Sequence, residues 1–162
     1  DYNGFTDSIL DSLEPEKKNI ISVKTVSSDE FAKLNDVFAI KTESIKFACI
    51  TYINTRNDEA FSVNTSYIPL NLFPEIVEDI NNKKPSFEIL RGKYPLVPCS
   101  SKSSLEVIYT DQADAGLLQL QPGQALIEVN NVLYSKSGQP VEYIISKYRA
   151  DKCKLMFENY KK

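Results

Sequence analysis

Polar side chains that could hold a ligand share one face of each of three segments with β-strand composition. They are Tyr52 and Asn54 in the first segment, Ser62, Asn64 and Ser66 in the second, and Glu142, Ser146 and Tyr148 in the third. Side chains two positions apart on a strand share a face. A carboxylate or phenol without a partner on a half-buried face costs about 1–3 kcal/mol. These residues therefore either face solvent or line a site for a polar ligand, and the pattern alone leaves both interpretations open.

The sequence contains no histidine, the side chain that most often acts as a general base or metal ligand. Its absence excludes Ser-His and Cys-His nucleophilic catalysis. The three cysteines, Cys49, Cys99 and Cys153, lie far apart and form no Cys-x-x-Cys pair, which predicts free thiols rather than a zinc site or a disulfide framework. We therefore expect a protein that is not an enzyme and that uses neither a cofactor nor a metal.

Charge and hydropathy are typical of a soluble globular protein. The chain has 19 Lys and Arg against 22 Asp and Glu, and a net charge of −3 creates no overall field that attracts nucleic acid. No apolar run approaches the roughly 20 residues that span a bilayer, and residues 1–4 lack the layout of a secretory signal. We expect one cytoplasmic domain over residues 1–162, with no membrane partner.

Strands and short helices alternate along the chain. β-Branched and aromatic residues predict strands over residues 19–26, 46–54, 61–68, 105–109, 126–134 and 141–148. Capping residues and apolar spacing predict helices over residues 6–13, 27–34, 73–77, 86–90 and 111–118. In this scheme Ser86 is the N-cap of its helix, and Pro15 stops the first one.

The order of these elements repeats once. A capped helix followed by a hairpin occupies residues 29–68, and the same order returns over residues 111–148. Hairpins join antiparallel strands, so the repeat predicts an α+β fold with one antiparallel β-sheet and helices packed on one face. The excursions between the hairpins would leave a cleft beside the sheet, where a small ligand could bind.

Several short motifs stand in a fixed order along the chain. They are Gly4-Phe5-Thr6-Asp7, Thr65-Ser66-Tyr67-Ile68-Pro69, Leu72-Phe73-Pro74, Ser86-Phe87-Glu88-Ile89-Leu90, Gly138-Gln139-Pro140-Val141-Glu142 and Tyr148-Arg149-Ala150-Asp151. In order and spacing they resemble the UTRA domain, the effector-binding domain of GntR-type transcription regulators of the HutC group. The ordered set covers nearly the whole chain.

The resemblance implies a chorismate-lyase-like fold, in which an antiparallel sheet is flanked by helices. It also implies a domain that binds a small metabolite effector and forms homodimers. In such regulators an N-terminal winged helix-turn-helix domain binds the operator, and the effector changes its affinity for DNA. These residues contain no such module, so we expect contact with DNA only through a domain outside this chain.

The resemblance also assigns effector contacts to particular residues. The loop equivalent to Phe5-Thr6 would offer backbone amides and a hydroxyl to an anion, and Ser86 matches a serine at the start of a ligand-facing helix. Glu142 and Tyr148 match a glutamate and a tyrosine that contact ligand hydroxyls. Residues from both ends of the chain would then form one site.

This sequence departs from the family members that sense sugar phosphates. The departures are Tyr52 and Asn54 in place of two arginines, Asn64 in place of a glutamate, and Glu88 in place of a tyrosine. Tyr and Asn do not supply the bidentate, charge-assisted bonds with which arginine holds phosphate. Either another cation, such as Arg56 or Lys147, substitutes, or the effector is neutral or singly charged, such as a sugar or an amino acid.

The expected mechanism is a shift in conformational population. An effector would bind between the Phe5-Thr6 loop and the polar face of the sheet, and would order that loop. Two other functions stay open at this point. One is an enzyme related to chorismate lyase, which shares the fold, and the other is a dimerisation module that binds no ligand.

Overall fold

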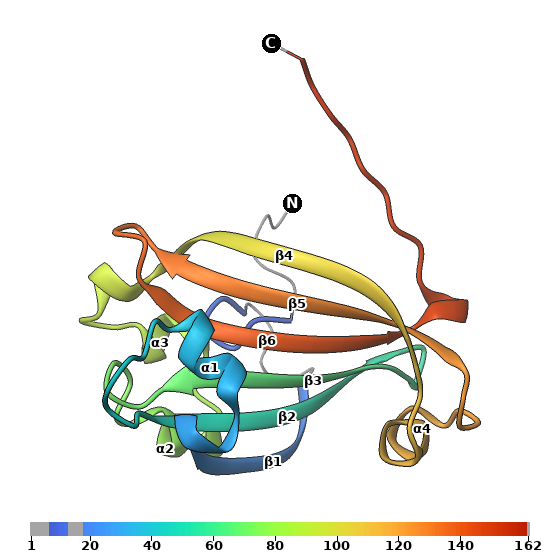
Figure 1. The fold of residues 1–162 in the computed structure, drawn as a ribbon, viewed down its shortest axis with the longest axis horizontal. Coiled ribbons are helices and arrows are strands. Elements are labelled where there is room, and N and C mark those ends of the chain that lie inside the picture. Colours follow the sequence, from blue (N-terminus) through green and yellow to red (C-terminus); the bar gives the residue numbers. More distant parts are fainter. Residues whose placement is uncertain (1–6, 13–17, 162) are drawn as a thin grey trace.

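The computed structural model of the chain describes residues 7–12 and 18–161. Six strands form one sheet in the order β1-β2-β3-β6-β5-β4, and every neighbouring pair is antiparallel (Figure 1). The strands are β1 (Lys18–Ser27), β2 (Lys46–Arg56), β3 (Glu59–Pro69), β4 (Pro98–Tyr109), β5 (Ala125–Ser135) and β6 (Pro140–Arg149). The predicted α+β class with an antiparallel sheet is confirmed.

Short helices occupy the connections between strands. They are α1 (Ala32–Val37), α2 (Ile76–Asn81), α3 (Ser86–Ile89) and α4 (Gln112–Leu118), with the 3₁₀ turns η2 (Ser28–Glu30), η3 (Tyr94–Leu96) and η4 (Ala150–Lys152). None of the described helices is long and apolar enough to cross a membrane.

The repeat predicted from the sequence extends further than expected. In the first half β1 is followed by α1 and the β2–β3 hairpin, and in the second half β4 is followed by α4 and the β5–β6 hairpin. The two halves meet where β3 pairs with β6 at the centre of the sheet. The fourth strand is longer than the predicted 105–109, because its polar, serine-rich beginning pairs with β5 along almost its whole length.

Helices lie on both faces of the sheet, so the predicted placement on one face is wrong. On one face Leu34 of α1 packs with Phe47 and Tyr143, and Leu118 of α4 packs with Val63 and Leu126. On the other face α2, α3 and the 7–12 segment cover Ile50, Tyr52 and Ile144. We call this second surface the site face. Helices cover this face too because the long connection between β3 and β4, which has no counterpart in the repeat, supplies α2 and α3.

The 7–12 segment forms turns and no helix, contrary to the helix predicted over residues 6–13. Asp7 has a left-handed backbone with φ of +67°. A helix this short is unstable alone, and hydrogen bonds to the sheet hold the segment in a different conformation. Phe5, Thr6 and Leu13, which also belonged to this prediction, lie outside the described residues.

Helix α4 offers a test of the local sequence signals. The Asp111 carboxylate caps α4 by accepting a hydrogen bond from the amide of Asp114 at 2.8 Å. Asp111→Ala is expected to lower the free energy of unfolding by about 0.5–2 kcal/mol, because that amide loses its partner. Asp111→Asn keeps an acceptor and is expected to lose less. Urea denaturation followed by far-UV circular dichroism compares the two, and equal losses would contradict the capping role.

Candidate functional site

Glu142 on β6 is fully buried, and its carboxylate accepts four hydrogen bonds. The Ser66 hydroxyl of β3 and the Ile9 amide donate to Oε2 at 2.6 and 2.9 Å. The Ser8 hydroxyl and the Leu10 amide donate to Oε1 at 2.7 and 3.1 Å. Three of the four donors belong to the 7–12 segment, so this carboxylate fastens the segment to the centre of the sheet.

Two opposing effects act on the pKa of Glu142. Burial raises it above its ordinary value, and the hydrogen bonds from Ser66 and from the 7–12 segment work against that rise. Both carboxylate oxygens act only as acceptors here, an arrangement that suits the ionised form.

Asp7 is the second anchor of the segment, and three side chains of the sheet donate to it. The Tyr52 hydroxyl donates to its backbone oxygen. Asn54 Nδ2 donates to one carboxylate oxygen and the Tyr148 hydroxyl to the other. Burial raises the pKa of Tyr52 and of Tyr148 well above the ordinary value, and the nearby carboxylates add to both rises. The two phenols therefore stay protonated and act as donors.

Asn64 is fully buried on the site face, and only the nitrogen of its side-chain amide has hydrogen-bond partners among the described residues. Its Nδ2 donates to the Ser62 hydroxyl at 3.1 Å and to the Tyr52 backbone oxygen at 3.4 Å. Its Oδ1 has no hydrogen-bond partner among the residues that the structure describes. A buried acceptor without a donor costs about 1–3 kcal/mol, so this atom calls for a partner that carries an N–H or O–H group.

The strand register brings a lysine to the same cluster. Lys18 of β1 lies opposite Asn54, Asn54 opposite Ser62, and Ser62 opposite Tyr148, so one row of side chains crosses four strands. Lys18 Nζ lies 4.7 Å from the centroid of the Tyr52 ring. Burial lowers the pKa of Lys18, whereas the charges of Asp7 and Glu142 oppose that change. Sequence reasoning missed Lys18, because the pairing of β1 with β2 is not readable from strand composition.

Other predicted residues fall at the edge of the cluster or outside it. The helix α3 has Pro85 as its N-cap, so the predicted capping role of Ser86 is wrong. The Ser86 hydroxyl instead donates to the backbone oxygen of Ser12 at 2.8 Å, and thereby holds the far end of the 7–12 segment. Glu88 is exposed on α3, and no hydrogen bond joins it to the cluster among the described residues. Phe5 and Thr6 lie outside those residues.

The two cations considered as phosphate partners are engaged elsewhere. Lys147 points to the opposite face, where it pairs with Asp114 of α4 at 2.8 Å. The Arg56 guanidinium lies 4.0 Å from the centroid of the Phe61 ring, and that ring packs against Tyr148. Lys18 is thus the cation that shares a row with the cluster.

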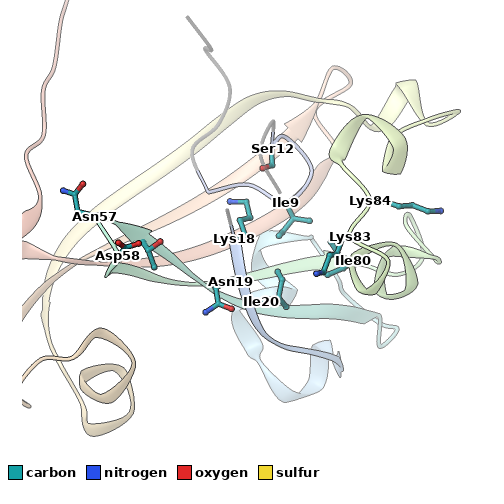
Figure 2. A pocket seen from close by; sticks show the side chains of 11 residues that line it. Ile9, Ser12, Lys18, Asn19, Ile20, Asn57, Asp58, Ile80, Lys83 and Lys84 are labelled. Atoms are coloured by element: carbon teal, nitrogen blue, oxygen red, sulfur yellow. The ribbon is translucent and has the colours of Figure 1, made fainter. Parts of the chain in front are cut away.

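An open cavity of about 880 Å³ lies beside the 7–12 segment (Figure 2). Its walls include Ile9 and Ser12 from the segment, Lys18 and Ile20 from β1, and Ile80 and Lys83 from α2 and the turn after it. In Figure 2 the Lys18 side chain extends toward the segment that carries Ile9 and Ser12. The described residues hold no group of three side chains arranged to bind a metal ion. The wall also carries three lysines, Lys18, Lys83 and Lys84, so the arrangement can hold a small polar organic molecule by hydrogen bonds and positive charge.

Fold and site together define an α+β domain with a polar cluster and a ligand-sized cavity on one face of an antiparallel sheet. The family model for the UTRA domain matches residues 17–154. The chain therefore belongs to the UTRA domain family, the domain found in GntR-family transcription regulators.

Curated relatives are transcription regulators. The chain is 23% identical over 141 residues to the HTH-type transcriptional regulator YurK of Bacillus subtilis, and the match covers 86% of this chain and 56% of YurK. It is 21% identical over 158 residues to an Escherichia coli protein named "Probable fructoselysine utilization operon transcriptional repressor", covering 97% of this chain and 63% of that protein. The chain thus spans less than two thirds of the length of each of these relatives.

Solved structures share the fold. The C-terminal domain of YurK superposes with a TM-score of 0.78 at 20% identity, covering 87% of this chain and 95% of that domain. A GntR-family regulator from Enterococcus faecalis gives a TM-score of 0.74 at 18% identity, with 88% and 99% covered. The C-terminal domain of a histidine utilization repressor from Pseudomonas syringae gives 0.71 at 14% identity, with 90% and 99% covered.

Removal of the central carboxylate tests the anchoring role. Glu142→Ala leaves two hydroxyls and two amides without their acceptor, so the free energy of unfolding is expected to fall by about 1–3 kcal/mol or more. The amides of Ile9 and Leu10 are expected to exchange with deuterium faster than in the wild type, and hydrogen-exchange mass spectrometry measures this. Glu88→Ala is the matched control and should leave that exchange unchanged. Equal protection of these amides in Glu142→Ala would contradict the anchoring role.

Proposed function

We propose that this chain is the effector-binding and dimerisation part of a longer GntR-type regulator of the HutC group, and that it does not catalyse a reaction. Its relatives are regulators, and it aligns with only part of their length. In this proposal the rest of the protein includes an N-terminal DNA-binding domain, residues 1–162 form a single domain, and the regulator works in the cytoplasm. The similarity to a histidine utilization repressor domain supports the HutC group.

One observation carries the assignment of the site. The side chains of Tyr52, Asn54, Ser86, Glu142 and Tyr148, assigned to an effector from the sequence, all bond to the 7–12 segment. That segment is also a wall of the open cavity. A molecule in the cavity would contact the segment directly, and so would change how firmly the segment is held.

The proposed mechanism is a population shift of the 7–12 segment. A ligand that binds one position of the segment better than another shifts the equilibrium by its differential affinity. A coupling of about 1–3 kcal/mol changes the affinity for operator DNA roughly 5- to 150-fold. The segment is suited to this role because hydrogen bonds between polar groups hold it at both ends, and these bonds can be exchanged for bonds to a ligand.

Thermal unfolding with a metabolite panel tests the binding role. The panel contains sugars, sugar phosphates, amino acids and sugar acids, and at least one member is expected to raise the melting temperature of the wild-type chain. A panel without any stabilising member would contradict the proposal.

Lys18 tests where that panel member binds. Lys18→Met removes one charged contact from the cavity wall and is expected to weaken binding about tenfold in isothermal titration calorimetry. Lys24→Met is the matched control, because Lys24 lies on β1 opposite Cys49, on the face away from the cavity. Equal affinities of the two variants would place the ligand elsewhere.

The edge strand β4 supports a homodimer. Leu105, Val107 and Tyr109 lie on its site face, where they are 47%, 60% and 74% exposed. One side of this strand has no neighbour in the sheet, and three apolar side chains in a row favour burial against a second copy of the chain.

Size-exclusion chromatography with light scattering tests this dimer. Val107→Lys places a charge inside the proposed contact and is expected to shift the mass from two chains to one. Ser104→Lys adds the same charge to the opposite face of β4 and should leave the mass unchanged. A single chain in the wild type, or a dimer in Val107→Lys, would contradict this contact.

A further inference from the structure

The Asp7 carboxylate lies in a ready-made site for an acid group. Asn54 and Tyr148 each donate to one of its oxygens, and both donors come from central strands of the sheet. Lys18 stands in the same row of side chains. Two directed donors and a nearby positive charge form a fixed receptor for one carboxylate.

The carboxylate that fills this receptor belongs to Asp7 of the 7–12 segment, whereas the donors Asn54 and Tyr148 belong to strands of the sheet. Asp7 reaches it with a left-handed backbone, φ +67°, a conformation that is uncommon outside glycine and that aspartate adopts more readily than most residues. Strand pairing holds the backbones of Asn54 and Tyr148 in place independently of Asp7, so both side chains stay within reach of the same position when Asp7 leaves it. A carboxylate from another molecule can therefore replace that of Asp7.

A second, independent feature indicates what the replacing molecule carries besides its acid group. Asn64 Oδ1 is buried without a partner among the described residues, on the row next to that of Asn54. Rows on one face are about 7 Å apart along a strand. A hydroxyl or ammonium group a few bonds from the carboxylate would reach this acceptor.

We propose that Asp7 is an internal occupant of the effector site, and that the effector is a small carboxylic acid with a hydroxyl or ammonium donor that displaces the Asp7 side chain. This inference rests on the proposed function. The cavity of about 880 Å³ accommodates the rest of the molecule, and Lys18 borders both the cavity and the acid site. The acid site itself offers neutral donors and one lysine, which suit a single negative charge there better than the double charge of a phosphate, while Lys83 and Lys84 border the cavity beyond it.

Chemical rescue of an Asp7 variant tests the acid site. Asp7→Gly empties the receptor, and glycine adopts a positive φ without strain. Sodium acetate at about 100 mM is expected to raise the melting temperature of this variant by about 2 °C or more above sodium chloride of equal ionic strength. The wild type is expected to show no such gain, because Asp7 already fills the receptor. Acetamide, which has the shape of acetate without its charge, should have no effect on either protein.

4-Hydroxybutyrate and 4-aminobutyrate test the donor. Both carry a hydroxyl or ammonium group a few bonds from the carboxylate, and each is expected to bind Asp7→Gly at least about threefold more tightly than butyrate does. The double variant Asp7→Gly/Asn64→Leu should bind all three equally. Affinities of the two donor-bearing acids no higher than that of butyrate would overturn the role of Asn64.

Other outcomes separate this inference from the proposed function. If Asp7→Gly does not fold, Asp7→Asn takes its place, since its amide meets the Asn54 and Tyr148 donors less well. Failure of acetate to exceed chloride in the variant that folds overturns the acid site. A wild-type panel member that is a neutral sugar supports the proposed function and overturns this inference. Rescue by acetate without any panel member supports the acid site and contradicts the proposed function.

Discussion

The fold of the site depends on one buried charge. Moving the Glu142 carboxylate out of water is costly unless its oxygens are fully hydrogen-bonded. Ser66 alone cannot satisfy it, so three donors must come from the 7–12 segment. This requirement fixes the segment on the sheet, positions Asp7 over Asn54 and Tyr148, and places Ile9 and Ser12 as a cavity wall. A local electrostatic constraint on β6 thus organises residues that are more than 130 positions away in the chain.

The site also depends on a break in symmetry. The two halves of the sheet have the same order of strand, helix and hairpin, and β3 meets β6 at their junction. Helices α1 and α4 occupy equivalent places in the two halves and pack on the same face. The site face receives its cover from elements outside the repeat, namely the 7–12 segment, α2 and α3. That cover extends over the first half of the sheet and onto β6, while the apolar residues of β4 stay exposed at the far edge. The element order of the sheet repeats, but the site forms only where the elements outside the repeat cover it.

Strand alternation was enough to predict which polar residues share a face, because it depends only on backbone geometry. Tyr52, Asn54, Glu142 and Tyr148 do meet on one face of the sheet. The remaining features of the site depend on contacts between distant parts of the chain, which the sequence pattern does not reveal. Lys18 joins the cluster only through the register of β1 against β2. Ser86 donates to the backbone oxygen of Ser12 and does not cap α3, because Pro85 stands at the N-cap and Ser86 lies in the first turn. The predicted first helix failed for a related reason, because its residues bond to Glu142 and to the sheet.

If the Asp7 side chain occupies the acid site, an effector must bind tightly enough to compete with it. A group tethered to the protein competes at an effective concentration of about millimolar for a short flexible link. The acid group of a ligand must therefore be supported by further contacts, and the cavity walls and Asn64 are placed to supply them. Tyr52, Asn54 and Tyr148 hold Asp7 through neutral donors, which bind a carboxylate less tightly than a pair of arginines would. Under the proposal, tyrosine and asparagine in place of an arginine pair weaken the hold on an anion, so that Asp7 exchanges more readily with a ligand.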